Sequence, residues 1–451
     1  MTRPLGGGTF GTVYETTRLP DQTNPNVAEP GLWTGTTYRS DDGVGGPNPV
    51  VKIFTDGGHY TTIREMSLLS KVCHPFVVRC LGWTVAPTSR AEVYLERAQC
   101  DVEQLLSHRP LHPPERRRLC AHVLAALVHL HEQHGTMHRD VKPENILFFP
   151  PDVFKLSDLG LATMGRAEDA TNTGGVTSLW FRAPEVAVGC DYDKRIDVWS
   201  LGAVLLYTIL ASRVGSNTAR SIFPLRAEDN ESQFRAAIGL AGPPWERHSG
   251  GHLAAQYAAL TSEVDREEWA FLQRALAWPD RRATALELLG DPYLAPTHHH
   301  LPDKPLLTNP RDPPQILREH LVQGPLSARA TRAIAWFQLI LRRFRWSAGI
   351  QLPHKKKIAL TRVLECVFCS PGAFHGGGQA HRELVVAVFN LGVKLFCVCA
   401  LSEKRITTLL EENGLGYHRP PRSKAVRRLT SWLCAFTKFR LDLFEPPPLF
   451  F

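Results

Sequence analysis

Hydrophobic positions change their spacing along the chain, and the change predicts two regions of different structure. Residues 50–54 and 93–95 are short, mostly apolar runs of the kind that form buried β-strands. Residues 61–72 lie between them and repeat apolar side chains at helical spacing. Residues 20–49 are rich in Gly, Pro, Asn, Asp and Thr and predict a long loop. The first hundred residues should therefore form a small strand-rich region with one helix.

Helical spacing dominates from about residue 114 onward. It predicts helices over 115–134, 197–211 and 263–289, the last of them broken near Pro279. Many prolines between 292 and 314 then predict a linker or an extended strap. The fold class expected from this order is α+β, with a small strand-rich lobe, a larger helical lobe and a tail.

Charge separates the tail from the rest of the chain. The 451 residues carry 52 Lys+Arg and 44 Asp+Glu, a net +8. Residues 301–451 hold 23 Lys+Arg and 10 Asp+Glu, a net +13, which leaves 29 and 34, a net −5, for residues 1–300. This distribution argues against a protein that is basic throughout and coats nucleic acid. It predicts two functional regions.

The cysteines and the apolar runs indicate in which cellular compartment the protein is expected. Ten scattered cysteines are too few for a disulfide scaffold and favour a reducing, intracellular setting. No apolar segment typical of a secretory signal follows Met1. Residues 384–401 are mostly apolar, but Asn390 and Lys394 interrupt them, so a buried helix or strand pair is expected rather than a membrane span. We expect no membrane partner, and either nucleus or cytoplasm remains open.

Three glycines near the start, Gly6, Gly8 and Gly11, have the spacing Gly-x-Gly-x-x-Gly and are followed by Val13. A Walker A loop needs a lysine directly after the last glycine, where this chain has a threonine. A Rossmann loop needs a helix there, but the next residues have the pattern of a returning strand. The remaining geometry is strand, glycine loop and strand, a flap whose backbone amides can lie over phosphates.

The segment from His138 to Asn145 reads His-Arg-Asp-Val-Lys-Pro-Glu-Asn. It matches the whole His-Arg-Asp-x-x-x-x-Asn catalytic loop, and the sequence here resembles the eukaryotic protein kinases. Further motifs of that family follow in order: Asp158-Leu159-Gly160, Ala183-Pro184-Glu185, the run from Asp197 to Gly202, and Arg282, which is expected to pair with Glu185. Such an ordered series implies a serine/threonine protein kinase that acts on protein substrates.

In the small lobe, the resemblance implies an ATP-binding site. Lys52 would contact the α- and β-phosphates, and Glu65 on the following helix would hold Lys52 in an ion pair. The glycine flap with Val13 would cover the nucleotide. Glu96 and Ala98 would meet the adenine through backbone groups, just after Leu95.

In the large lobe, the resemblance implies the groups that act on the phosphate and the acceptor. Asp158 would bind Mg²⁺ between the β- and γ-phosphates, and Asn145 a second metal ion. Asp140 would orient the substrate hydroxyl and accept its proton, and Lys142 would lie near the γ-phosphate. The cofactors implied are ATP and Mg²⁺.

Within the family, the sequence is most similar to the cyclin-dependent, proline-directed kinases. Residues 61–69 resemble the helix that in those kinases binds an activating subunit, so such a partner is expected on the Glu65 helix. Counting back twelve residues from Glu185 places Thr173 at their activation-loop phosphosite, where Arg64 and Arg139 could clamp a phosphate. The alternative is that Thr173 is an unmodified loop residue. The substrate-side insert of proline-directed kinases is not recognisable, so proline direction stays open.

The resemblance sets the expected domain boundaries. A bilobal kinase domain would cover residues 1–297, with an N-lobe over about 1–98 and a C-lobe over about 99–297, and residues 298–451 would form a basic accessory region of unknown fold. Only five residues precede Gly6, so the first strand is expected to be nearly absent unless the chain starts further upstream. The short start and the unfamiliar tail would also suit a viral kinase.

The tail itself resembles no family. Its cysteines at 366, 369, 397 and 399 could bind zinc, but they stand in apolar runs, and buried thiols are expected instead. The basic runs 355–357 and 422–428 are either solvated faces, a nuclear-import signal, or a surface for an acidic partner or nucleic acid.

Two other functions compete with the kinase. A pseudokinase scaffold is disfavoured because Lys52, Glu65, Asp140, Asn145 and Asp158 are all present. A small-molecule phosphotransferase of related fold is disfavoured because the Ala183-Pro184-Glu185 motif belongs to a peptide-positioning platform.

Overall fold

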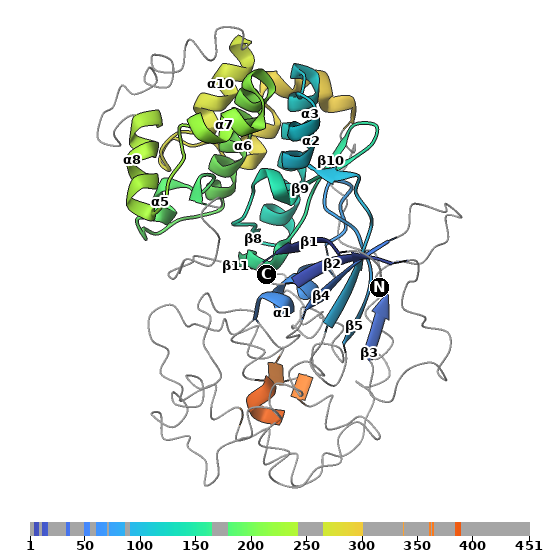
Figure 1. Cartoon of the computed structure of the whole chain (residues 1–451). Helices are drawn as coiled ribbons and strands as arrows, with labels where there is room; N and C mark the ends of the chain where they lie inside the picture. The colour runs from blue at the N-terminus through green and yellow to red at the C-terminus, as the bar shows by residue number, and fades with distance from the viewer. Residues whose placement is uncertain are drawn as a thin grey trace. The chain divides into compact units, whose positions relative to one another are not determined.

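The computed structural model describes residues 4–8, 11–16, 33–36, 49–54, 60–69, 72–85, 91–164, 179–241 and 265–300, together with 337, 360–361, 363–364 and 384–388 (Figure 1). The chain packs into two compact units. The small unit comprises residues 1–71, 80–96 and 309–451, and the large unit comprises residues 72–79 and 97–308.

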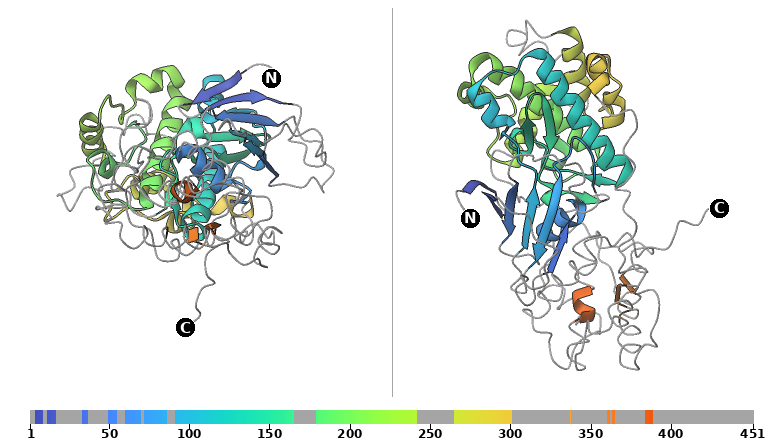
Figure 2. Two further views of the ribbon diagram at one scale, coloured as in Figure 1. Left: turned by 90° about the horizontal axis from the view of Figure 1, so that it is seen from below. Right: turned by 90° about the vertical axis from the view of Figure 1, so that its right-hand side faces the viewer.

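The small unit contains one antiparallel sheet, whose strands lie side by side in the right-hand view of Figure 2. Its strand order is β1-β2-β4-β6-β5-β3. The strands are β1 (Pro4–Gly8), β2 (Gly11–Glu15), β3 (Trp33–Thr36), β4 (Val50–Phe54), β5 (Cys80–Val85) and β6 (Ala91–Leu95). Helix α1 (Tyr60–Leu69) follows β4. The alternating burial of β6 shows that one face of the sheet meets the core.

These elements confirm the predicted strands at 50–54 and 93–95 and the predicted helix between them. The glycine flap is also confirmed, because β1 and β2 pair with Gly8 opposite Gly11. The expectation that the first strand is nearly absent was wrong, since the glycine-rich β1 itself pairs with β2. The loop predicted over 20–49 was wrong at β3, where Trp and Thr residues with high β propensity pair with β5 at the sheet edge.

The large unit is mainly helical. Its helices are α2 (Val102–His108), α3 (Pro113–Val128), α5 (Pro184–Ala187), α6 (Arg195–Val214), α7 (Ser216–Ile222), α8 (Asn230–Ala241), α10 (Arg266–Ala275) and α11 (Ala285–Leu289). Two small sheets accompany them, β10-β9-β7 and β11-β8, built from β7 (Cys100–Asp101), β8 (Thr136–Met137), β9 (Ile146–Phe149), β10 (Val153–Leu156) and β11 (Thr163–Met164). The catalytic-loop motif lies between β8 and β9.

The sequence predicted α3, α6, α10 and α11, whereas α2, α5, α7 and α8 were not predicted individually. The predicted break near Pro279 is confirmed, since the segment 263–289 contains two helices, α10 and α11, on either side of it. The extended strap predicted from Pro292 was wrong at its start, where residues 292–300 form a 3₁₀ helix. Its Tyr293 is buried and donates a hydrogen bond of 2.7 Å to Glu268 of α10, which anchors the segment to the core.

Helix α6 forms the centre of the large unit. All residues from Ile196 to Ala211 are buried, so the helix has no solvent-facing stripe. By length and composition it could cross a membrane, but 89% of its apolar window is buried inside the protein. It is therefore a core helix that neighbouring helices surround.

Gly202 lets helix α10 approach α6 closely. A Cβ at this position would lie 2.9 Å from Ala275 Cβ and 3.0 Å from Leu276 Cγ. We expect Gly202→Ala to destabilise the protein by about 1–3 kcal/mol through overpacking. Gly239→Ala in α8 is the matched control, because open space surrounds it and the gain in helix propensity should stabilise by up to about 1 kcal/mol. Urea denaturation measures both, and a neutral Gly202→Ala would contradict the close packing.

Candidate active site

Lys52 and Glu65 form a buried ion pair in the small unit. Lys52 Nζ lies 2.7 Å from Glu65 Oε1 and 2.8 Å from Oε2. Strand β4 supplies the lysine and helix α1 the glutamate, and both residues are buried. Because burying an unpaired charge is costly, each side chain holds the other in place. The pair fixes the position of one ammonium group beside the sheet.

The glycine flap runs along the strand next to this lysine. Strand β2 pairs with β4 so that Val13 stands opposite Lys52, and Lys52 stands opposite Val93 of β6 on its other side. Gly6 and Gly8 lie in β1, and Gly11 begins β2. Glu96 and Ala98 follow β6 in half-buried positions, the first in the small unit and the second in the large one.

The catalytic loop of the large unit orients the Asp140 carboxylate. Lys142 Nζ and Asn145 Nδ2 each donate a hydrogen bond of 2.8 Å to Asp140 Oδ2. Asn145 Nδ2 also donates to the backbone oxygen of Asp140, again at 2.8 Å. Two donors on one oxygen hold the carboxylate in a single direction and leave Oδ1 to face another group.

Asp197, at the start of α6, binds the backbone of this loop. Its Oδ2 accepts from the backbone N–H of His138 and its Oδ1 from that of Arg139, both at 2.8 Å. His131 Nε2 lies 2.8 Å from Oδ2. Burial alone raises the pKa of this carboxyl, but the hydrogen bond and charge of His131 bring the pKa below its ordinary value. An ionised Asp197 thus holds Arg139 in its left-handed conformation, at φ 70°.

Asp158 belongs to the same assembly. Asn145 O accepts from the backbone N–H of Ser157 at 2.9 Å and from its hydroxyl at 3.0 Å. His138 Nε2 donates to Ser157 O at 2.9 Å. Asp158 itself is left-handed, at φ 58°. The structure therefore brings Asp140, Lys142, Asn145 and Asp158 together in one unit, and Lys52 with Glu65 in the other.

Glu185 and Arg282 confirm the predicted pairing across 97 residues. Arg282 Nη1 lies 2.5 Å from Glu185 Oε1, and Nη2 lies 3.0 Å from Oε2. The guanidinium also lies over the Trp199 ring, 5.0 Å from its centroid. This bidentate pair anchors α5, which carries the Ala-Pro-Glu motif, to the core.

The regulatory residues are only partly described. Arg139 lies in the catalytic loop and Arg64 in α1, but the Arg64 side chain and Thr173 lie outside the described residues, as do the tail cysteines and basic runs named above. The phosphate clamp therefore stays a prediction.

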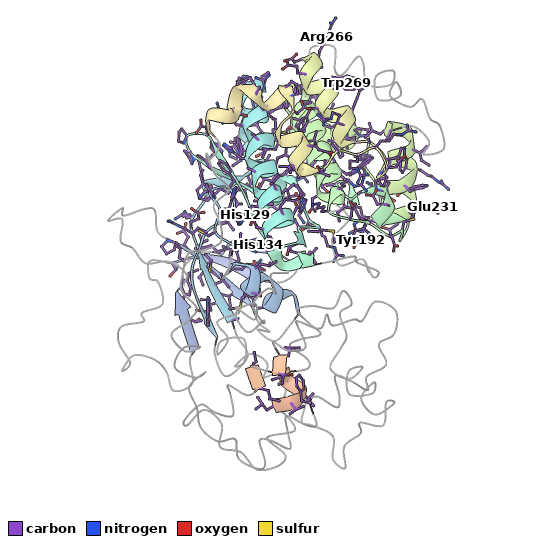
Figure 3. The ribbon with its side chains drawn as sticks, turned by 180° about the vertical axis from the view of Figure 1, so that it is seen from behind. His129, His134, Tyr192, Glu231, Arg266 and Trp269 are labelled. Atoms are coloured by element: carbon purple, nitrogen blue, oxygen red, sulfur yellow. The ribbon has the colours of Figure 1, made fainter. Side chains whose placement is uncertain are left out.

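A histidine cluster that sequence reasoning missed lies where α3 leads into the catalytic loop. His74 stacks on His129 with ring centroids 4.9 Å apart, and His129 Nε2 lies 3.3 Å from His134 Nε2 (Figure 3). Burial, with the charge of His129 added, lowers the pKa of His74 to about 3, and burial also lowers that of His129. Three histidines within six residues, at 129, 131 and 134, were the sequence signal.

This cluster predicts that acid weakens the fold. The unfolded chain takes up a proton on His74 near pH 6.5, but the folded chain does so only near pH 3, so stability is complete above 6.5 and falls between those values. The limiting slope is about 1.4 kcal/mol per pH unit. We expect His74→Phe, which keeps an aromatic ring, to show a shallower loss between pH 7 and 5. Urea denaturation at both pH values compares the two proteins, and equal slopes would contradict the assignment.

Comparison with known proteins agrees with this geometry. The family model for the protein kinase domain matches residues 51–294. Mitogen-activated protein kinase HOG1A of Wallemia ichthyophaga is 29% identical over 316 residues, which cover 64% of this chain and 80% of the relative. Cell division control protein 2 homolog 2 of Trypanosoma brucei brucei is 32% identical over 276 residues, covering 57% and 78%. The CTD kinase subunit alpha of Schizosaccharomyces pombe is 27% identical over 326 residues, covering 69% and 53%.

The matched region contains the buried Lys52–Glu65 pair, the catalytic loop and the Glu185–Arg282 anchor. Since the family model covers more than half of the chain and the motifs occupy their places in the fold, the chain belongs to the protein kinase family and is a serine/threonine protein kinase.

Proposed function

We propose that this kinase transfers the γ-phosphate of Mg²⁺-bound ATP to serine and threonine hydroxyls of protein substrates, with Asp140 as the group that orients the acceptor. The observation that carries the proposal is the Asp140 carboxylate, held at 2.8 Å by both Lys142 and Asn145. A hydroxyl at Oδ1 would donate its hydrogen bond to an oxygen already fixed in direction.

Asn145 and Asp158 fit a magnesium site. The Nδ2 group of Asn145 donates both of its hydrogen bonds to Asp140. The side-chain oxygen of Asn145, Oδ1, would then serve as the metal ligand. Among the described residues no group of three His, Cys, Asp or Glu side chains could hold a metal ion alone. Mg²⁺ usually takes one or two protein oxygens and completes its shell with substrate phosphates and water. When bound, the ion would neutralise charge on the phosphates.

The remaining residues would bind and cover the nucleotide. Lys52, fixed by Glu65, would supply a positive charge to the α- and β-phosphates. Gly6, Gly8 and Gly11 would allow the flap backbone to approach the phosphates without a Cβ in the way. Val13, on the strand beside Lys52, would contact the nucleotide, and Glu96 and Ala98 would offer backbone groups to the adenine.

One experiment tests this function. Purified full-length protein is incubated with labelled ATP, Mg²⁺ and generic protein substrates, beside Lys52→Met and Asp158→Ala. Transfer by the wild type and loss in both variants supports the proposal. Transfer no greater than in the variants would favour a scaffold, and transfer that survives EDTA would remove the magnesium role.

Regulation at Thr173 is a separate part of the proposal. A phosphate there carries nearly two negative charges, which Arg139 and Arg64 would bind. We expect Thr173→Ala to lower activity roughly tenfold or more, since a hydrogen bond to a charged group contributes about 1.5–3 kcal/mol. The control is Thr171→Ala, two residues away on the same segment. Equal activity of the three proteins after treatment with an activating kinase would reject the switch.

Proline direction is proposed from the relatives, which include a mitogen-activated protein kinase and a cell division control protein 2 homolog. A peptide library with and without proline after the acceptor residue tests it. Equal rates on both halves of the library would reject it.

A further inference from the structure

The C-terminal half of helix α1, where the structure describes every side chain, is buried in all directions. The five consecutive residues Glu65 to Leu69 are each 7% exposed or less. Successive residues of a helix turn by about 100°, so five of them sample every direction. A helix that packs only against a sheet keeps an exposed polar stripe, and no such stripe occurs between residues 65 and 69. Something other than the sheet therefore covers this helix.

The face turned away from the sheet shows this most clearly. Glu65 points to Lys52 of β4. Ser67 lies about 200° further round the helix, and Leu68 about 300°. Both are nevertheless buried, and the polar Ser67 has an interaction partner. The covering layer therefore includes the side opposite the Lys52–Glu65 pair.

The tail belongs to the same compact unit as α1. Residues 309–451 pack with residues 1–71 and 80–96 rather than with the large unit. The segment Leu384–Val388 is helical, wholly apolar and 3% exposed or less at every position. Leu360, Val363 and Leu364 are fully buried as well. These tail segments lie in a hydrophobic interior, although the tail as a whole carries a net +13.

We propose that the buried tail residues Leu360, Val363 and Leu364 and the segment Leu384–Val388 form a layer that covers helix α1, and that this layer holds Glu65 against Lys52. The kinase then carries within its own chain the surface that a separate activating subunit would otherwise supply. The family model ends at residue 294, so this layer is an addition to the shared domain. Its effect on activity rests on the proposed role of Lys52, but the packing itself does not.

Hydrogen exchange on the full chain tests the packing. Val386→Asp places a charge in the buried tail helix, and Leu286→Asp is the matched control on α11, where the leucine is 56% exposed. We expect Val386→Asp to raise amide exchange in residues 60–69 at least tenfold, with exchange in α6 unchanged, and Leu286→Asp to change neither. Unchanged exchange in residues 60–69 of Val386→Asp would overturn the proposal.

A second measurement decides the case in which Val386→Asp unfolds the whole chain. The chain has four methionines, and Met66 is the one within α1. Full-length protein labelled with photo-methionine is irradiated, and Met66→Leu identifies the cross-links that start at residue 66. Cross-links from Met66 into residues 309–451 support the layer, and cross-links from Met66 to other segments alone would overturn it.

Activity is read separately in the same samples. We expect Val386→Asp to lose at least tenfold in phosphate transfer while Leu286→Asp retains it. Exchange and cross-linking are measured without nucleotide. A wild type that shows the expected packing but no transfer would therefore count against the proposed reaction and leave the layer supported.

Discussion

Asp140→Asn is expected to phosphorylate protein substrates roughly 10²–10⁴ times more slowly than the wild type, the usual worth of a positioned general base. The amide keeps the size of the side chain but cannot accept the hydroxyl proton. Its amide oxygen can still accept from Lys142 and Asn145, which places the NH₂ group where Oδ1 would face the substrate hydroxyl. Nucleotide binding should change little, because in the proposed site Lys52 binds the phosphates and Asp140 orients the acceptor hydroxyl.

The measurement is the steady-state rate on one protein substrate, with the KM for ATP and the melting temperature determined alongside. Asp191→Asn, on an exposed loop, is the matched control and should retain full activity. A rate for Asp140→Asn within threefold of the wild type would remove Asp140 from the proposed role. A large fall in melting temperature would instead show that its contribution is structural.

Arg282→Met should cause the largest loss of stability, about 3–5 kcal/mol. The substitution leaves the buried Glu185 carboxylate without its bidentate partner, and it removes the cation above Trp199. Arg281→Met is the matched control, because Arg281 is the neighbouring residue of the same type and its side chain is 43% exposed. It should change stability by about 0–1 kcal/mol.

Denaturant unfolding at pH 7 compares these variants with Glu185→Gln/Arg282→Met. Removing both charges eliminates the unpaired carboxylate, so the double variant should recover part of the stability lost in Arg282→Met. Equal losses in the Arg281 and Arg282 variants would show that the buried pair contributes nothing particular.

The sequence predicted those parts of the site that depend on local spacing. Glu65 lies on the helix that follows the strand of Lys52, and the loop from His138 to Asn145 is contiguous. The resemblance of these short segments to the protein kinases was therefore enough to indicate both. Strand β3 was missed because an edge strand needs no apolar alternation, and its pairing with β5 was invisible in the sequence.

Contacts between distant segments required the structure. Asp197 lies 59 residues from His138, and no spacing rule indicated that its two oxygens would bind the backbone of the catalytic loop. The three-histidine cluster depends in the same way on His74, which reaches His129 only in the folded chain. Burial of residues 65–69 on every side of α1 was also beyond the sequence, since the spacing of apolar residues in the helix does not show what covers it.

The Asp197 contact has a consequence for how the enzyme fails on heating. The carboxylate that holds Arg139 begins a helix buried from Ile196 to Ala211, so the loop cannot loosen while that helix stays packed. Catalytic competence and core integrity are thus one cooperative property. Thermal inactivation should therefore coincide with melting of the large unit. Temperature-sensitive substitutions should occur at the contact between Gly202 of α6 and Ala275 of α10 as often as at the catalytic residues.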